Sequence, residues 1–275
     1  MTTDVNRRVL PGFSLSLGYT LLYMSLLVAI PLGAGFLKAS HLSLAEFCAA
    51  VASERALAAY RLTVGVSFAS AIINVAVGVL VAWVLVRYEF PLKGLLDSLV
   101  DLPFALPTAV AGLVYSDLFV ARGWYGRFLV PLGIQGAYSR LGIVLVLVFI
   151  GFPFVVRTLQ PVLEGLDKDV EEAAACLGAN RLQTVLRVIF PSILPAVVTG
   201  FALAFARSLG EYGSVVFVSG NMPFRTEIAP VLIVARLEEF AYTEATAIAV
   251  VLLAISFLTL FAINLLERWT KRHHG

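Results

Sequence analysis

Residues 62–86 read LTVGVSFASAIINVAVGVLVAWVLV, a run of 25 residues without one charged side chain. A helix needs roughly 20 mostly apolar residues to cross the hydrocarbon core of a bilayer. Uncharged apolar runs also occupy residues 13–37, 141–156 and 245–266. In lipid, a helix satisfies all of its own backbone hydrogen bonds, so each of these runs is expected to be a transmembrane helix.

The composition supports this interpretation. Of 275 residues, 60% are hydrophobic and 14% are charged, whereas soluble domains carry about a quarter charged residues. The net charge of +2 is too small to indicate a nucleic-acid partner, and the basic residues flank apolar runs, as membrane anchors do. We therefore expect residues 1–275 to form a single membrane domain in contact with lipid.

Two further apolar stretches are interrupted. Residues 102–120 contain two prolines, and residues 191–219 contain Arg207 and Glu211. Counting both, we expect an all-α polytopic membrane protein with six transmembrane helices and both termini on one side. That side carries 11 Lys and Arg residues and the opposite side carries eight, which favours cytoplasmic termini.

Residues 157–190 form the longest segment on the side of the termini. Asp169 and Glu172 have the spacing of a helix-capping box, and residues 180–183 repeat it. Gly178 lies between them, where a helix commonly ends in a left-handed residue. The segment is predicted to be helix, tight turn, helix. On the opposite side, residues 228–237 are apolar but too short to span, which indicates an interfacial or re-entrant segment.

The sequence offers little for catalysis. It contains no Gly-rich phosphate loop, no serine elbow and no zinc-protease helix motif, and its three histidines lie in a loop and a tail. We expect no catalytic residues, no metal site and no cofactor in this chain. A membrane-embedded lipid-modifying enzyme is the alternative from another class, and it would need carboxylates or histidines clustered at one interface.

Residues 172–178 read EAAACLG, and nine residues later residues 188–191 read VIFP. This pattern resembles the E-A-A-x-x-x-G-x(9)-I-x-L-P loop of ABC importer permeases. The resemblance implies that the short helix is a coupling helix that docks on an ATPase subunit. The residues expected to couple are Glu171, Glu172, Ala173, Ala174, Leu177 and Gly178.

Residues 7–13 (RRVLPGF), 101–112 (DLPFALPTAVAG) and 207–213 (RSLGEYG) are similar to the T-type permease subunits of bacterial sulfate/thiosulfate ABC importers, and the similarity covers nearly the whole chain. The resemblance implies a type I importer in the bacterial inner membrane that carries sulfate or thiosulfate inward by alternating access. The implied partners are two ATP-binding subunits, which hold the ATP and magnesium, a second permease subunit of the W type, and an extracytoplasmic sulfate/thiosulfate-binding protein. A molybdate or tungstate permease of the same family is the alternative, although those chains are usually shorter.

Arg207 is expected near mid-membrane, where an arginine costs about 2.5–3.5 kcal/mol on insertion scales and therefore needs a compensating contact. Glu211 lies at i+4 and can pair with it. Structural pairing and direct contact with the transported anion both remain open, and each can hold in a different conformation. The candidate anion-path residues are Arg207, Ser208, Glu211 and Thr108.

Small residues recur every four positions at Ala196, Gly200, Ala204 and Ser208, which predicts a close helix-packing face. Asn74, inside the uncharged run of residues 62–86, is expected to make an interhelical hydrogen bond.

Overall fold

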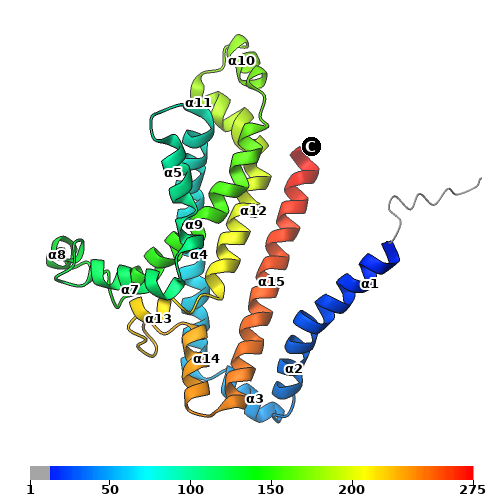
Figure 1. Ribbon diagram of the computed structural model, residues 1–275, viewed down its shortest axis with the longest axis vertical. Coiled ribbons are helices and arrows are strands. Elements are labelled where there is room, and N and C mark those ends of the chain that lie inside the picture. The colour runs from blue at the N-terminus through cyan, green and yellow to red at the C-terminus, as the bar shows by residue number, and fades with distance from the viewer. Residues whose placement is uncertain (1–12, 275) are drawn as a thin grey trace, which may run out of the picture.

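The computed structural model describes residues 13–274, whose regular structure is helical throughout (Figure 1). The N-terminal motif at residues 7–12 lies outside the described residues. Five helical segments are long and apolar enough to cross a membrane, namely Phe13–Ala39, Glu54–Arg87, Arg140–Glu164, Arg181–Leu209 and Tyr242–Leu265. The all-α prediction is confirmed.

These spans carry the following labels. The first comprises α1 (Phe13–Met24), the π-helical turn η1 (Ser25–Ala29) and α2 (Ile30–Ala39), followed by α3 (Leu44–Val51) and the second span, α4 (Glu54–Arg87). The next span is α9 (Arg140–Glu164), and the fourth comprises α11 (Arg181–Thr184), the π-helical turn η3 (Val185–Ile189) and α12 (Phe190–Leu209). The last is the start of α15 (Tyr242–His274). Helix α1 stands away from the other spans and none of its residues is buried, whereas α2 packs against α15 (Figure 1).

The core is the contact between α4, α9 and α12. A Cβ added to Gly78 of α4 would lie 2.7 Å from the Val155 side chain, and one added to Gly200 of α12 would lie 3.2 Å from the Val155 Cα. Glycine therefore lets both helices approach the same point on α9. All four members of the small-residue row on α12 are buried, which confirms the predicted packing face.

The predicted span at residues 102–120 is broken. A hairpin of α5 (Lys93–Val100) and α6 (Leu102–Ala105) precedes α7 (Thr108–Phe119), whose 12 residues cover only about 18 Å. Leu106 is extended, with ψ at 131°. The break follows from Pro107, which disfavours helical geometry at the residue before it. The six-span expectation thus becomes five long helices and one interrupted element within the described residues.

The prediction of a helix over residues 191–219 is wrong at both ends. The helix begins earlier, at Arg181, and ends at Leu209, before the four-residue α13 (Val215–Val218). The Glu211 side chain accepts a hydrogen bond from the backbone N–H of Ser214. This bond stabilises a turn after Gly210 in place of another helical turn.

The predicted helix–turn–helix is present but shorter than residues 157–190, because α9 runs to Glu164. Its first helix, α10 (Lys168–Cys176), lies at one end of the molecule (Figure 1). Gly178 has φ +84°, and the Asn180–Gln183 capping box is formed. The Asp169–Glu172 box is wrong, because α10 begins two residues earlier than that box requires and no side chain caps it.

The opposite end carries α3, the turn to α15 and α14 (Ala229–Glu238) (Figure 1). This ten-residue helix packs against α15 and α4, and it confirms that residues 228–237 are too short to span. A side arm holds α8 (Gly126–Leu129) and the 3-10 turn η2 (Val130–Leu132).

Candidate functional site

The two broken elements meet one another. A Cβ on Gly112 of α7 would collide with the backbone of Ser214, and one on Gly213 would collide with the Thr108 hydroxyl. The turn after α12 is therefore packed directly on the first turns of α7. Irregular backbone at membrane depth is tolerated where protein buries it or where it lines an aqueous cavity. The junction of α7 with residues 210–214 is irregular backbone that protein buries, since Glu211 and Ser214 are both buried there.

Glu211 is the centre of the junction and is only 3% exposed. Its Oε2 accepts a hydrogen bond from Arg207 Nη1 at 2.6 Å. Its Oε1 accepts bonds from Ser214 N at 3.0 Å and from Ser214 Oγ at 3.1 Å. The carboxylate is held by three donors, and only one of them is charged.

Arg207 differs from its partner in exposure. It lies in the last turn of α12, where the helix dipole favours a cation, and its side chain is 34% exposed against 3% for Glu211. The predicted Arg207–Glu211 ion pair is confirmed as a contact. One guanidinium edge is used by Glu211, and the rest of the group reaches the surface of the chain.

The other two candidates differ from each other. Thr108 lies at the junction against Gly213. Ser208 is 2% exposed, donates to the Ala204 carbonyl at 2.8 Å and lies 3.3 Å from Ser70 Oγ of α4. The structure therefore brings Thr108 together with the ion pair and places Ser208 in the packed interface between α12 and α4.

The α4 face opposite Ser208 is unexpectedly polar. Ser67, Ser70 and Asn74 are all fully buried, one or two turns apart. The interhelical hydrogen bond expected for Asn74 is wrong, because neither its oxygen nor its nitrogen has a partner among the described residues. Its amide lies against Gly151 and near Ala204, and neither residue has a side chain that can accept or donate a hydrogen bond.

The coupling segment divides into two faces. Ala174 is buried and Glu171 is turned toward the bundle, where its Oε1 lies 2.7 Å from Arg87 Nη2 at the end of α4. The Arg87 guanidinium also lies over the Trp83 ring, 5.3 Å from its centroid. The outer face consists of the exposed Glu172, Ala173, Leu177 and Gly178, with Leu177 90% exposed.

A second charged cluster ties α5 to α9. Arg157 of α9 donates to Asp97 at 2.6 Å and to Asp101 at 2.8 Å. The Gln160 amide donates to Asp97 at 2.9 Å, and this bond, together with that from Arg157, holds the pKa of the Asp97 carboxyl below its ordinary value. Sequence reasoning missed this cluster and the Arg87 contact, because each joins residues more than 50 positions apart.

Comparison with protein families gives one match over most of the chain. Residues 74–272 match the model of the binding-protein-dependent transport system inner membrane component.

Curated relatives match over nearly the full length. The chain is 49% identical over 271 residues to the sulfate transport system permease protein CysT of Salmonella typhimurium, covering 98% of both chains. It is 48% identical to the protein of the same name from Escherichia coli, again with 98% of both covered. The protein of that name from Synechocystis is 49% identical over 254 residues, covering 92% of this chain and 89% of the relative.

Solved structures share the fold. A bacterial ABC transporter that imports the acidic polysaccharide alginate matches with a TM-score of 0.76 at 16% identity, covering 93% of this chain and 94% of that one. The same score is found at 18% identity for an alginate transporter in complex with a periplasmic protein bound to an alginate pentasaccharide, with 94% of each chain covered. At these identities the likeness concerns the fold alone.

Proposed function

Because this chain belongs to the family of binding-protein-dependent transport system inner membrane components, we propose that it is a permease subunit of an ATP-driven sulfate importer. The observation that carries the proposal is identity of 48–49% over 98% of the length to permeases named for sulfate transport. Sulfate is a dianion, and each charge that enters against the membrane potential costs about 2.3 kcal/mol per 100 mV. Import of sulfate therefore needs a coupled energy source.

The exposed face of α10 is proposed to receive that energy. It is a short helix ended by Gly178 at φ +84°, and it presents Leu177 fully to solvent. An apolar side chain that is 90% exposed on a helix outside the spans is suited to a groove of another protein. We assign this groove to an ATP-binding subunit, which also holds the ATP and magnesium.

The proposed assembly has two ATP-binding subunits, a second permease subunit of the W type and an extracytoplasmic binding protein. The solved alginate transporter bound to its periplasmic protein supports an assembly of this general kind. In this proposal the α10 end and both termini lie in the cytoplasm, and the α14 end faces outward. The Lys and Arg count of 11 against eight supports that orientation.

The junction of α7 with residues 210–214 is proposed as the constriction that the anion passes. Arg207 combines an anchoring bond to buried Glu211 with a surface that is one-third exposed. A guanidinium can hold a carboxylate through one edge and offer its remaining N–H groups to a tetrahedral oxyanion. Alternating access requires such a contact to be made in one state and released in another.

Uptake of labelled sulfate tests the proposal in a strain that lacks its own sulfate permease and expresses this chain with its partner subunits. We expect ATP-dependent uptake that unlabelled thiosulfate reduces and that equimolar molybdate leaves nearly unchanged. Molybdate competing better than unlabelled sulfate would contradict the sulfate assignment and favour the molybdate alternative.

A further inference from the structure

A cavity of about 420 Å³ lies between α4 and α9, on the half of the molecule that carries α13 and α14. Its lining is Ala58, Arg61, Leu62, Gly65 and Val66 of α4, with Arg140 of α9 and Phe224. A Cβ added to Gly65 would meet no atom within 4 Å, so the glycine faces open space. One water occupies about 30 Å³ of liquid, so the cavity admits a small anion with part of its hydration shell.

The charge of this cavity is positive. Among the residues whose side chains the structure describes, neither Arg61 nor Arg140 has a carboxylate within ion-pair distance. Arg140 Nε donates to the Arg225 carbonyl at 2.9 Å, which orients the side chain and leaves its terminal N–H groups for another acceptor. Two guanidinium groups from two helices therefore line one space.

The position of Arg140 adds to this potential. It is the first residue of α9, a helix of 25 residues capped by Ser139. The positive end of the helix dipole disfavours a cation there by about 0.3–1 kcal/mol and favours an anion. An anion bound beside Arg140 would offset this unfavourable interaction with the helix dipole.

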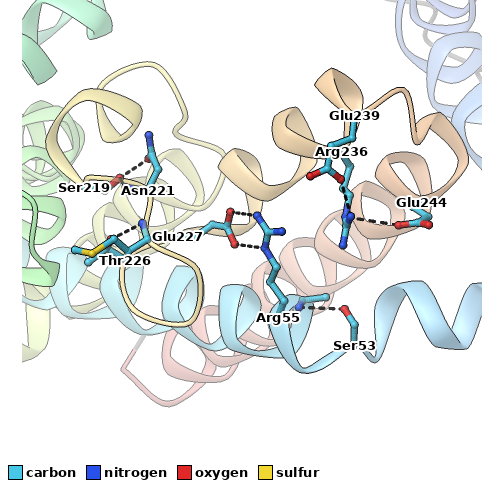
Figure 2. Close-up of polar contacts among 11 residues, drawn as sticks. Ser53, Arg55, Ser219, Asn221, Thr226, Glu227, Arg236, Glu239 and Glu244 are labelled. Atoms are coloured by element: carbon cyan, nitrogen blue, oxygen red, sulfur yellow. Dashed lines mark hydrogen bonds and ion pairs between the residues drawn. The ribbon is translucent and has the colours of Figure 1, made fainter.

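The nearby carboxylate does not neutralise the cavity. Glu227 is 4% exposed, and both of its oxygens are bound by Arg55, at 2.7 and 2.8 Å (Figure 2). This pair fixes the end of the loop at residues 219–227 to the start of α4. The Glu227 carboxylate is thus paired with Arg55 and does not offset the positive charge of Arg61 and Arg140.

The same loop, which forms a wall of the cavity, is held by internal hydrogen bonds. Asn221 accepts from Ser219 Oγ at 2.6 Å, and Thr226 Oγ1 accepts from the Met222 N–H at 3.0 Å (Figure 2). Phe224 is held at φ +63°, a conformation rare for an aromatic residue. Phe224 is 57% exposed, although it lines the cavity.

We propose that Arg61 and Arg140 form an extracytoplasmic receiving site for a tetrahedral oxyanion dianion, at which sulfate first contacts the permease. This inference rests on the proposed function and deepens it. Arg61 precedes Ser70 by nine residues of α4, which is about 14 Å along the helix. Ser70 contacts Ser208, the neighbour of Arg207. Arg61 and Arg207 are therefore separated by that distance along the axis of α4.

Arg61 and Arg140 are both exposed, so the site remains hydrated and binds weakly. Weak binding suits a site that must receive an ion and then release it inward. Arg207 would be the second arginine that the anion meets, and its guanidinium is paired with the buried Glu211 carboxylate.

The test places a reporter in the cavity of the full complex in proteoliposomes that hold the two ATP-binding subunits. Gly65→Cys is sterically free and is combined with Cys48→Ser and Cys176→Ser, which remove the two native thiols. The anionic thiosulfonate reagent MTSES is applied from outside with increasing sulfate. We expect saturable protection by sulfate, at least tenfold weaker after Arg61→Gln with Arg140→Gln.

Three controls make the result decisive. Arg122→Gln removes an exposed arginine outside the cavity and should leave protection unchanged. Chloride should not protect. Sulfate uptake with loaded binding protein, measured in the same proteoliposomes, tests the proposed function separately, because a complex that imports sulfate without any sulfate protection overturns the receiving site alone.

A docking surface for an acidic protein is the competing interpretation of the same arginines. It predicts that the double variant loses affinity for the loaded binding protein while sulfate protection is retained. That outcome would also overturn the receiving site.

Discussion

Removing Arg207 should destabilise the permease, because it leaves the Glu211 carboxylate buried without a counter-charge. Loss of one member of a buried pair costs about 3–5 kcal/mol, and the 34% exposure of Arg207 places the cost near the lower end, about 3 kcal/mol. The two hydrogen bonds from Ser214 to the carboxylate remain, but their donors are neutral and supply no counter-charge. Arg207→Met is therefore expected to lower the unfolding temperature of the purified complex markedly.

A second change separates stability from transport. Adding Glu211→Gln to Arg207→Met removes the buried charge and keeps an acceptor for Ser214, and it leaves the amide NH2 group without an acceptor, at a cost of about 1 kcal/mol. About 2 of the 3 kcal/mol should thus return. Sulfate uptake should not return, because a charge-assisted hydrogen bond to the anion is worth about 1.5 kcal/mol or more, over tenfold in kcat/KM.

The assay pairs thermal unfolding of the complex with sulfate uptake per assembled complex in proteoliposomes. Recovery of stability with uptake still below one tenth supports a direct role for Arg207 on the anion path. A double variant with wild-type uptake refutes that role and leaves Arg207 as a packing residue.

Three further outcomes are expected. Gly178→Val should uncouple ATP hydrolysis from transport, because a β-branched residue in the left-handed conformation costs about 1–2 kcal/mol and would reorient α10. Gly178→Asn is the control and should have a mild effect. The measurement is ATPase stimulation by loaded binding protein, and wild-type stimulation in Gly178→Val would contradict the coupling role. Arg87→Gln or Glu171→Gln should lower sulfate carried per ATP hydrolysed, since their 2.7 Å contact joins α10 to α4, and an unchanged ratio would contradict this. On intact cells, an impermeant thiol reagent should label Cys48 and not a cysteine introduced by Asp169→Cys, and the reverse pattern would invert the proposed orientation.

Much of the fold was predictable because apolar length in a bilayer is a strong constraint. The uncharged runs at residues 62–86 and 245–266 lie within spanning helices, and the row from Ala196 to Ser208 is the packing face it was predicted to be. The predicted helix bounds were wrong at polar or proline-containing positions. Pro107 divides a predicted span, and Glu211 ends another by capping the Ser214 N–H, which composition alone does not reveal.

The candidate site was predictable where it depends on residues close together in the sequence. The Arg207–Glu211 pair follows from i+4 spacing, which is local information. The contacts of Arg87 with Glu171 and of Arg157 with Asp97 join distant segments, and only the folded chain brings them together. The motif at residues 172–178 indicated a docking helix, but only the structure shows that Glu171 points inward while Leu177 points outward.

Accumulation of sulfate against its gradient at the expense of ATP is the defining activity of the proposed importer. Proteoliposomes with the purified complex, ATP inside and sulfate-loaded binding protein outside should accumulate labelled sulfate above its external concentration, and omission of either ATP or the binding protein should abolish this. Sulfate that merely equilibrates across the membrane, or that accumulates without ATP, would contradict the account.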